Sequence, residues 1–392
     1  MAKLEDVLYL NERLVEWRRD FHMHPEVGFQ EFRTSGKIKE ILDANHIPYL
    51  SGFSETAVLA EIDSGKPGPV IGIRADIDAL PMADLKTVEY HSQNPNACHA
   101  CGHDAHTAMG LGTAIYLNEH KDSFCGKVKI VFQPAEEGPA PGGAKGVVES
   151  GKMNDVQKML GIHCGPDFPV GSLGIRYGAM LASADNFRIK ITGLGAHGAY
   201  PHQGVDPIAT AIQIMNGFKD MEVRELDPVK QFVLSVCSFQ AGKLEATNVL
   251  PDVAEFSGTM RTLDNGVRDY MIRRMEEIAK GIAAVNHCEC EFTSAFVTPA
   301  LINDPKINEK YAEAITECME GGFVTEMLEP EMGYDDFARY GKLCDAAYVY
   351  LGTGIPGQKI IFHNPYWDIN EKALPIGVAV LTTAVEKLSA EY

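Results

Sequence analysis

Side chains that bind metals or move protons gather in four short segments of the chain. These segments are Ala100-Cys101-Gly102-His103-Asp104-Ala105-His106, Pro134-Ala135-Glu136-Glu137-Gly138, Gly161-Ile162-His163 and Phe362-His363-Asn364-Pro365. A thiol, several imidazoles and a carboxylate are the ligand set of a borderline metal such as zinc. The carboxylate of Glu136, beside another candidate ligand, is of the kind that moves a proton in metal-assisted hydrolysis. The four segments therefore predict a two-metal hydrolase.

A structural zinc site is the alternative for the first segment. With Cys98 and His99 included, five Cys and His side chains lie within nine residues, and not all of them can bind one metal. A zinc knuckle would need a second close pair of Cys or His nearby, and none follows. Adjacent glutamates are usually a solvated charge pair, and a lone histidine such as His163 more often packs in a core. We favour ligation because each of these residues follows a predicted strand.

The predicted elements explain how the candidate ligands meet. Short buried strands are predicted at residues 70–73, 128–132 and 158–163, and a helix at about 104–118. Open α/β sheets hold their active sites at the ends of such strands. Cys101 and His103 lie at the start of the helix, so its dipole is expected to lower the pKa of the Cys101 thiol.

Two aspartates follow the first of these strands, in Arg74-Ala75-Asp76-Ile77-Asp78-Ala79-Leu80-Pro81. We expect at most one of them to face the metal site directly. We choose Asp78, as a carboxylate that orients a ligand imidazole from behind. On spacing alone, the alternative that both aspartates simply sit in a turn stays open.

Two more histidines, His22 and His24, lie near the start of the chain in Arg18-Arg19-Asp20-Phe21-His22-Met23-His24-Pro25-Glu26. They are possible metal ligands. Packing or surface roles are favoured, because no thiol or carboxylate has the right spacing to complete a site with them. The preceding residues, 3 to 20, show the apolar period of a helix.

The pattern of the chain changes after about residue 184. Strand, helix, two strands, helix and strand are predicted at residues 187–191, 207–223, 231–239, 253–260, 266–285 and 288–293. This β-α-β-β-α-β order is typical of a split βαβ, or ferredoxin-like, α+β domain. We therefore expect a catalytic α/β domain formed by residues 1–184 and 295–392, with residues 185–294 inserted into it.

Composition excludes several classes of partner. The chain has 392 residues and a formal net charge of -19. A protein this acidic, without a basic stripe, is not expected to bind nucleic acid or an anionic membrane surface. We see no signal peptide and no apolar run of membrane-spanning length. Nine scattered cysteines do not suggest a disulfide framework, so we expect a reducing cytoplasm.

The motifs together resemble the M20 metallopeptidase family, and within it the aminoacylase-like amidohydrolases. This branch includes hippurate hydrolase, N-acetyldiaminopimelate deacetylase and the auxin-conjugate hydrolases of plants. The resemblance covers nearly the whole chain and also includes Gly195-Ala196-His197-Gly198-Ala199-Tyr200-Pro201. It implies a mixed-sheet, metallo-aminopeptidase-like catalytic domain with an inserted ferredoxin-like dimerisation, or lid, domain, and a homodimer or higher homo-oligomer.

The same resemblance implies roles for individual residues. Cys101 would bridge two divalent metals, with His103 and His163 on one of them and Glu137 and His363 on the other. Glu136 would be the general base. In the inserted domain, His197 would reach the partner subunit's active site and stabilise the oxyanion. Asn248 and Arg261 would hold the substrate carboxylate. Zinc is the expected metal, and Mn, Co or Ni would tolerate the same ligands.

The implied reaction is metal-dependent hydrolysis of the amide bond of an N-acyl-amino acid. A dipeptidase or carboxypeptidase of the same family is the alternative, and a non-catalytic metal-binding protein is disfavoured because Glu136 is present. Two departures from the family pattern, Gly333-Tyr334-Asp335-Asp336-Phe337 and Cys344-Asp345-Ala346, are expected near the substrate end. They leave the preferred acyl group and amino acid open.

Overall fold

The computed structural model describes residues 1–391, and the chain divides into two units. Unit 1 contains Met1–Met180, Ile302–Glu329 and the chain from Asp335 onward, and unit 2 contains Leu181–Leu301 and Pro330–Tyr334. Tyr392, the last residue of the expected third segment, lies outside the described residues. Unit 2 extends beyond the expected 185–294 because the pairing of its strands continues to Ala184 and Thr298.

Unit 1 is built on an eight-stranded mixed sheet. In spatial order its strands are β1 (Tyr49–Ser51), β2 (Val58–Asp63), β4 (Lys127–Gln133), β3 (Val70–Asp76), β5 (Lys158–Pro169), β16 (Asp345–Gly354), β6 (Ser172–Ile175) and β15 (Phe323–Glu326). The central strands β4, β3, β5 and β16 run parallel, and β2 and β6 pair antiparallel to them. β3 and β4 are almost wholly buried, as expected for parallel strands covered by helices on both faces.

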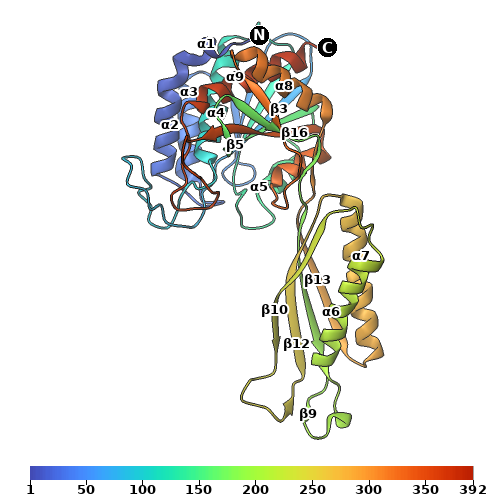
Figure 1. Ribbon diagram of the computed structural model, residues 1–392. Helices are drawn as coiled ribbons and strands as arrows, with labels where there is room; N and C mark the ends of the chain where they lie inside the picture. The colour runs from blue at the N-terminus through green and yellow to red at the C-terminus, as the bar shows by residue number, and fades with distance from the viewer. Residues whose placement is uncertain (392) are drawn as a thin grey trace. The chain divides into compact units, whose positions relative to one another are not determined.

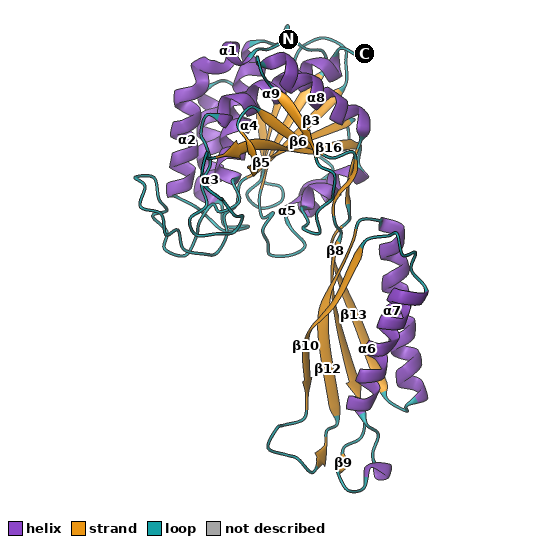
Figure 2. Ribbon diagram, viewed as in Figure 1, coloured by secondary structure: helices purple, strands orange, loops and turns teal. Residues whose placement is uncertain are grey.

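Helices pack around this sheet (Figure 2). They are α1 (Leu4–Val7), α2 (Asn11–Met23), α3 (Phe32–Ala44), α4 (His103–Glu119), α5 (Gly143–Glu149), α8 (Pro305–Cys318) and α9 (Ala373–Ser389), with 3-10 turns at Leu8–Leu10 and Asp336–Lys342. α4 contacts β3, α2 and α9, and its residues from His103 to Leu117 are all buried. Beyond its polar first turn it is mainly apolar, as expected for a helix that is covered on every side.

Several predicted elements need correction. The single helix predicted for residues 3–20 is wrong, because the 3-10 turn at Leu8–Leu10 separates α1 from α2. β1, β6 and β15 were not predicted, since strands of three or four residues are too short to show a period. β5 does not end at His163 but continues to Pro169, so this candidate ligand lies inside a strand.

Unit 2 is a four-stranded antiparallel sheet with two helices, visible in Figure 1. Its elements are β8 (Ala184–Thr192), α6 (Pro207–Arg224), β10 (Phe232–Ala241), β12 (Val253–Thr262), α7 (Asn265–Val285) and β13 (Glu289–Thr298), and the strands lie in the order β10-β12-β8-β13. Phe187, Ile189 and Ile191 of β8 join the core with the helices, whereas Asn186 and Arg188, which alternate with them, are exposed. This alternation follows the period of a strand with one covered face.

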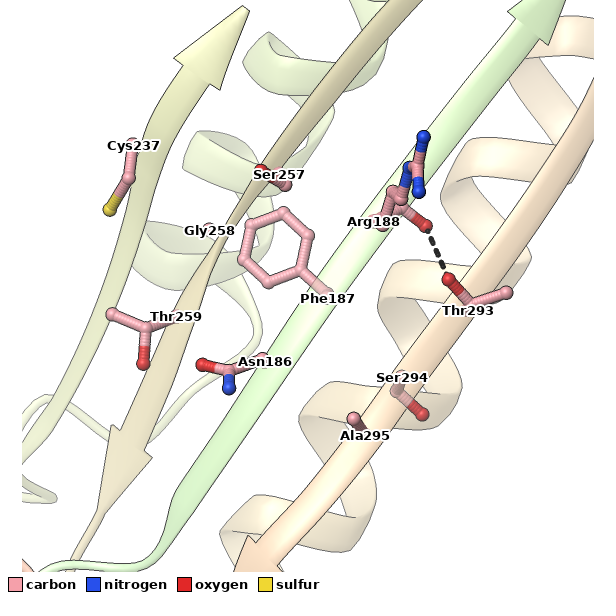
Figure 3. A pocket seen from close by; sticks show the side chains of 10 residues that line it. All are labelled: Asn186, Phe187, Arg188, Cys237, Ser257, Gly258, Thr259, Thr293, Ser294 and Ala295. Atoms are coloured by element: carbon pink, nitrogen blue, oxygen red, sulfur yellow. Dashed lines mark hydrogen bonds between the residues drawn. The ribbon is translucent and has the colours of Figure 1, made fainter. Parts of the chain in front are cut away.

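The smaller strands of unit 2 form a separate pair, β9 (Ala196–His197) with β11 (Val249–Leu250). Another pair, β7 (Gly178–Leu181) with β14 (Leu301–Asn303), lies where the chain passes from one unit to the other. Figure 3 shows a hollow over the four-stranded sheet, lined mainly by short side chains, where the Thr293 hydroxyl donates to the Arg188 carbonyl. None of the predicted site residues lines it. Among the described residues, no helix is long and apolar enough to cross a membrane.

Candidate metal centre

The structure brings the candidate ligands of unit 1 together in two overlapping groups. The donor atoms of Cys101, His103 and His163 lie within 4.8 Å of one another, and so do those of Cys101, Glu137 and His363. The Cys101 sulfur is 3.5 Å from His163 Nε2, and His363 Nε2 is 3.1 Å from Glu137 Oε1. Since Cys101 belongs to both groups, its sulfur lies where a bridging ligand would lie.

Gly102 sets the path of the chain between the first two ligands. Its φ is +99°, and α4 begins at the next residue. A Cβ on Gly102 would lie 2.8 Å from the Trp367 ring and 3.0 Å from the Cys164 Cβ. Glycine is the residue that takes this backbone conformation without strain and leaves that space free. Cys101 can therefore join the same site as His103, the first residue of the helix.

Hydrogen bonds fix which nitrogen of each buried imidazole is free. His103 Nδ1 donates to the Asp78 carbonyl at 2.9 Å and lies 3.2 Å from Asp78 Oδ1. His163 Nδ1 donates to the Cys164 carbonyl at 2.8 Å. In both residues Nε2 is left to face the site, which is the arrangement that orients metal-binding histidines. Burial lowers the pKa of His103, but the charge of Asp76 and the hydrogen bond to Asp78 outweigh it and raise that pKa to about 10 without metal, so a metal would replace a proton on Nε2.

The donor set fits a pair of divalent metals. Two buried atoms of the site, His103 Nε2 and Glu137 Oε1, make no well-directed hydrogen bond among the described residues, although Asp76 and His363 lie 3.3 and 3.1 Å from them. Buried polar atoms are normally satisfied, so unpaired ones need an explanation. Sulfur, imidazole nitrogen and carboxylate oxygen together match the preferences of zinc and its neighbours.

Asp78 holds two of these residues at once. Its Oδ1 faces the His103 ring, and its Oδ2 accepts a hydrogen bond from the Glu137 backbone N–H at 2.9 Å. Burial is the main reason that its pKa is raised. One carboxylate therefore contacts both the imidazole of a candidate ligand and the turn that carries Glu137.

The expectation that at most one of the two aspartates faces the site is wrong. Asp76 Oδ2 lies 3.3 Å from His103 Nε2, on the other side of the ring from Asp78. The reason is the period of a strand, in which residues two apart share a face. Asp76 also accepts a hydrogen bond from His106 Nδ1 at 2.6 Å, and His106 Nε2 accepts from the Cys164 N–H at 2.8 Å.

The sequence analysis set Asp76 aside in favour of Asp78, and it counted His106 among the candidates of the first segment without giving it a role. The available signal was their position, because Asp76 ends β3 and His106 lies three residues after His103 on α4. Residues three apart on a helix share a face.

Glu136 lies in a turn whose backbone is hydrogen-bonded to a residue far away in the sequence. Ala135, directly before it, has a φ of +52°, and its N–H donates to the buried Glu31 carboxylate at 2.9 Å. Glu136 is 9% exposed, and its Oε2 lies 4.0 Å from His103 Nε2. Without bound metal its pKa is raised well above the usual range, first by burial and then by the negative charges of Asp335, Glu137 and Asp336.

The Asp335-Asp336 pair joins a buried ion cluster rather than an open surface. Arg74 NH2 donates to Asp335 Oδ1 at 2.9 Å and to Asp336 Oδ1 at 3.1 Å. The Tyr348 hydroxyl also donates to Asp335, and the Ala144 N–H to Asp336. This departure from the family pattern therefore acts on the electrostatics around Glu136, and the expectation that it concerns only the substrate end needs correction.

The expected lowering of the Cys101 pKa is also wrong for the metal-free chain. Burial raises the pKa of this thiol well above its ordinary value, and the charges of Glu137 and Glu136 raise it further. The N-terminal dipole of one helix does not outweigh burial and nearby carboxylates. The thiolate that a metal ligand requires would form together with metal binding.

Unit 2 carries the other three predicted residues. His197 is exposed on β9 and pairs with Val249 of β11, which places it next to Asn248. Arg261 lies on β12, and its guanidinium stacks on the Tyr334 ring at 4.6 Å. Its NH1 is buried and has no hydrogen-bond partner among the described residues. None of the five candidate metal ligands lies in unit 2.

Comparisons with known proteins agree on the family. The description Peptidase family M20/M25/M40 matches residues 72–387. The chain is 38% identical over 365 residues to the N-acetylcysteine deacetylase of Bacillus subtilis, which covers 93% of each protein. It is 36% identical over 379 residues to thermostable carboxypeptidase 2 of Saccharolobus solfataricus, which covers 95% of this chain and 94% of that protein.

A solved structure of a Bacillus subtilis protein, a dinuclear metal-binding peptidase from the M20 family, also matches. It superposes with a TM-score of 0.84 at 34% identity and covers 98% of this chain and 99% of its own. The family description spans most of this chain and includes all five candidate ligand positions, which lie in β5, in α4 and in the loops around them. The chain therefore belongs to peptidase family M20/M25/M40.

Proposed function

We propose that the chain hydrolyses the amide bond of N-acyl-amino acids, releasing a carboxylic acid and a free amino acid. The observation that carries this is the pair of ligand groups sharing Cys101, with the Glu136 carboxylate beside them. Membership of a hydrolase family and the similarity to an N-acetylcysteine deacetylase over 93% of the chain support the same reaction.

His103 and His163 would hold one divalent metal, Glu137 and His363 the other, and Cys101 would bridge them. The buried His103 Nε2 and Glu137 Oε1, which make no well-directed hydrogen bond, support this assignment. A thiol and imidazoles favour zinc, with Mn, Co or Ni as alternatives. Two bound divalent ions would polarise the amide carbonyl, lower the pKa of a water and favour the ionised forms of Cys101 and Glu136.

Glu136 is the residue placed to move protons. It would accept the proton of the attacking water and return it to the nitrogen of the leaving amine. Burial around Glu136 keeps bulk water from competing for that proton. Asp78 would keep the His103 ring and the Glu137 turn in place while the charge changes.

We assign unit 2 as a ferredoxin-like dimerisation, or lid, domain. Its β8-α6-β10-β12-α7-β13 chain order and its β10-β12-β8-β13 strand order support this. His197 would stabilise the oxyanion, and Arg261 with Asn248 would bind the α-carboxylate of the substrate, for which an arginine fork is suited. A symmetric homodimer would present these residues to the site of the partner subunit.

The compartment and the excluded partners follow from composition. All nine cysteines are free thiols, which supports a reducing compartment such as the cytoplasm. The net charge of -19 argues against nucleic acid and anionic membranes as partners.

A carboxypeptidase is the second candidate, favoured by the similarity to thermostable carboxypeptidase 2. The deciding experiment is a hydrolysis screen of N-acetyl- and N-benzoyl-amino acids against dipeptides and longer peptides. Zn, Mn, Co and Ni are added in turn, with Glu136→Gln as the background control. Turnover of N-acyl-amino acids at a higher kcat/KM than any peptide is expected. Turnover confined to peptides would replace the proposal by the carboxypeptidase.

A further inference from the structure

A fully buried arginine lies beside the candidate metal centre. Arg18 of α2 is 0% exposed. Its Nε is 3.0 Å from Asp104, its NH2 is 2.7 Å from Asp368, and its NH1 is 3.2 Å from Glu371. The guanidinium also lies over the Tyr90 ring, 4.9 Å from its centroid. A planar guanidinium can hold several carboxylates in fixed directions, which a lysine cannot do.

The three carboxylates come from two separate parts of the chain, and each part carries metal-ligand candidates. Asp104 follows His103 in the first turn of α4, three residues after Cys101. Asp368 and Glu371 follow His363 in the segment that leads into α9. The two parts also touch directly, because the His363 N–H donates to the Ala100 carbonyl at 2.9 Å.

Hydrogen bonds of His22, Tyr90 and Lys86 add to the contacts around Arg18. His22 Nδ1 donates to Asp104 at 2.6 Å, and the Tyr90 hydroxyl donates to Asp368 at 2.8 Å. Lys86 Nζ donates both to His22 Nε2 and to the Trp367 carbonyl, each at 2.8 Å. Through His22 and Lys86 these bonds connect Asp104, at the start of α4, with Trp367, in the segment after His363.

This cluster is not well suited to bind a metal itself. Donor atoms of His22, Asp84 and Cys98 do lie within 4.8 Å of one another. However, the Lys86 ammonium already occupies the free nitrogen of His22, and a second cation would meet its repulsion. His22 therefore has a structural role, because its hydrogen bonds to Asp104 and Lys86 connect separate segments of the chain.

We propose that Arg18 is a positioning residue of the metal centre, which holds the Cys101-His103 segment and the His363 segment in register. This role depends on the metal centre proposed above. With Arg18 in place, the sulfur of Cys101 stays within reach of both His163 and the Glu137-His363 pair. Without it, the buried carboxylate of Asp104 and the partly buried carboxylates of Asp368 and Glu371 would lose their shared cation, and the two segments would separate.

The test compares metal binding in folded variants. Arg18→Met removes the charge, Arg18→Lys keeps a charge without the fork, and Arg19→Met is the matched control. Arg19 is the next residue, half exposed, and reaches only the Glu371 end of the cluster and Tyr90. Metal-free protein is titrated with Co2+ against a competing chelator, and the absorption of the thiolate–Co2+ bond reports Cys101. Far-ultraviolet circular dichroism checks the fold.

Arg18→Met is expected to bind Co2+ about 10- to 100-fold more weakly, the range seen when groups behind metal ligands are removed. Arg18→Lys should recover only part of this loss, and Arg19→Met should stay within about twofold of wild type. A folded Arg18→Met with wild-type Co2+ affinity and absorption overturns the role of Arg18.

If Arg18→Met does not fold, Asp368→Asn is the variant to use. It removes one of the three negative charges around Arg18 and leaves Arg18 paired with Asp104. Weaker Co2+ binding by folded Asp368→Asn supports the proposal, and wild-type binding overturns it. A wild-type chain that binds no Co2+ at Cys101 would overturn the metal centre itself. If the wild-type chain binds Co2+ normally and the Arg18 and Asp368 variants bind it equally well, only the positioning role of Arg18 is overturned.

Discussion

The buried carboxylate of Glu31 should make the stability of unit 1 depend on pH. It is 0% exposed, accepts hydrogen bonds from the Thr56 hydroxyl at 2.6 Å and the Ala135 N–H at 2.9 Å, and holds the turn before Glu136. Burial raises its pKa from 4.5 to about 7, with a smaller contribution from the charge of Asp78, and the Thr56 hydrogen bond opposes this.

The sign follows from proton binding. Between pH 4.5 and 7 the folded chain keeps a proton on Glu31 that the unfolded chain has lost. The stabilisation is therefore complete below the unfolded pKa and is lost as the pH rises through the folded one. Since each pKa unit corresponds to about 1.4 kcal/mol, the loss amounts to ~3 kcal/mol, most of it between pH 5 and 7.

Glu31→Gln isolates this contribution. The amide can still accept from the Ala135 N–H and donate to Thr56, but it carries no charge at any pH. The unfolding free energy of the variant minus that of wild type should therefore increase by ~3 kcal/mol as the pH rises through this window. Other titrating groups cancel in the difference.

Tryptophan fluorescence makes the measurement specific to unit 1. The chain has two tryptophans, Trp17 and Trp367, and both are buried in unit 1. Urea unfolding is followed at pH 5 to 8 with a chelator present, so that metal binding does not add its own pH dependence. Glu40→Gln, which removes a carboxylate that is 72% exposed on the same helix α3, controls for the loss of one negative charge. A difference that stays flat within about 1 kcal/mol would refute the reasoning.

Three further predictions concern the site. Glu136→Gln should keep both metals, measured by mass spectrometry, and lose ~10²- to 10⁴-fold in kcat. Glu137→Gln should instead lower metal occupancy. Full turnover by Glu136→Gln would exclude Glu136 as the general base. Cys101 should resist alkylation while metal is bound. After chelation it should react slowly at neutral pH and faster as the pH rises, because burial raises its thiol pKa. Fast labelling of the metal-free chain at pH 7 would contradict this. Mixing inactive His197→Ala and Glu136→Gln subunits should restore some activity if sites are shared across a homodimer, and proven heterodimers without activity would exclude such sharing.

Much of the framework around the site can be predicted from sequence because it depends on local patterns. β3, β4 and α4 show as apolar runs and periods, and the structure has them within a few residues of the predicted ranges. Polar residues at the end of a buried strand, such as Glu136 and Glu137, attract attention for the same local reason. The two overlapping donor groups around Cys101 combine the turn after β4, the start of α4, a position inside β5 and the loop of His363.

Properties that depend on distant neighbours could not be predicted. The helix N-terminus at Cys101 is visible in sequence, but burial and then the charges of Glu137 and Glu136 raise the thiol pKa, and these depend on the fold. Asp76 and His106 look like ordinary residues of a strand end and a helix until the fold places them against the His103 ring and Cys164.

Burial of charge is the property least visible in the sequence. Arg18 stands beside Arg19, and Glu31 follows Gln30, in stretches that read as solvent-exposed helix and turn. In the structure, Arg18 and Glu31 are 0% exposed, whereas the side chain of Arg19 is 42% exposed. A charge is retained in a core only when its partners are also fixed there, and the partners of Arg18 and Glu31 lie on the segments that carry Cys101, His363 and Glu136. Charged residues that look surface-exposed in the sequence, such as Arg18 and Glu31, can therefore connect the segments of the candidate metal centre. Arg19, which has the same side chain as Arg18, lies at the surface and makes only part of these contacts.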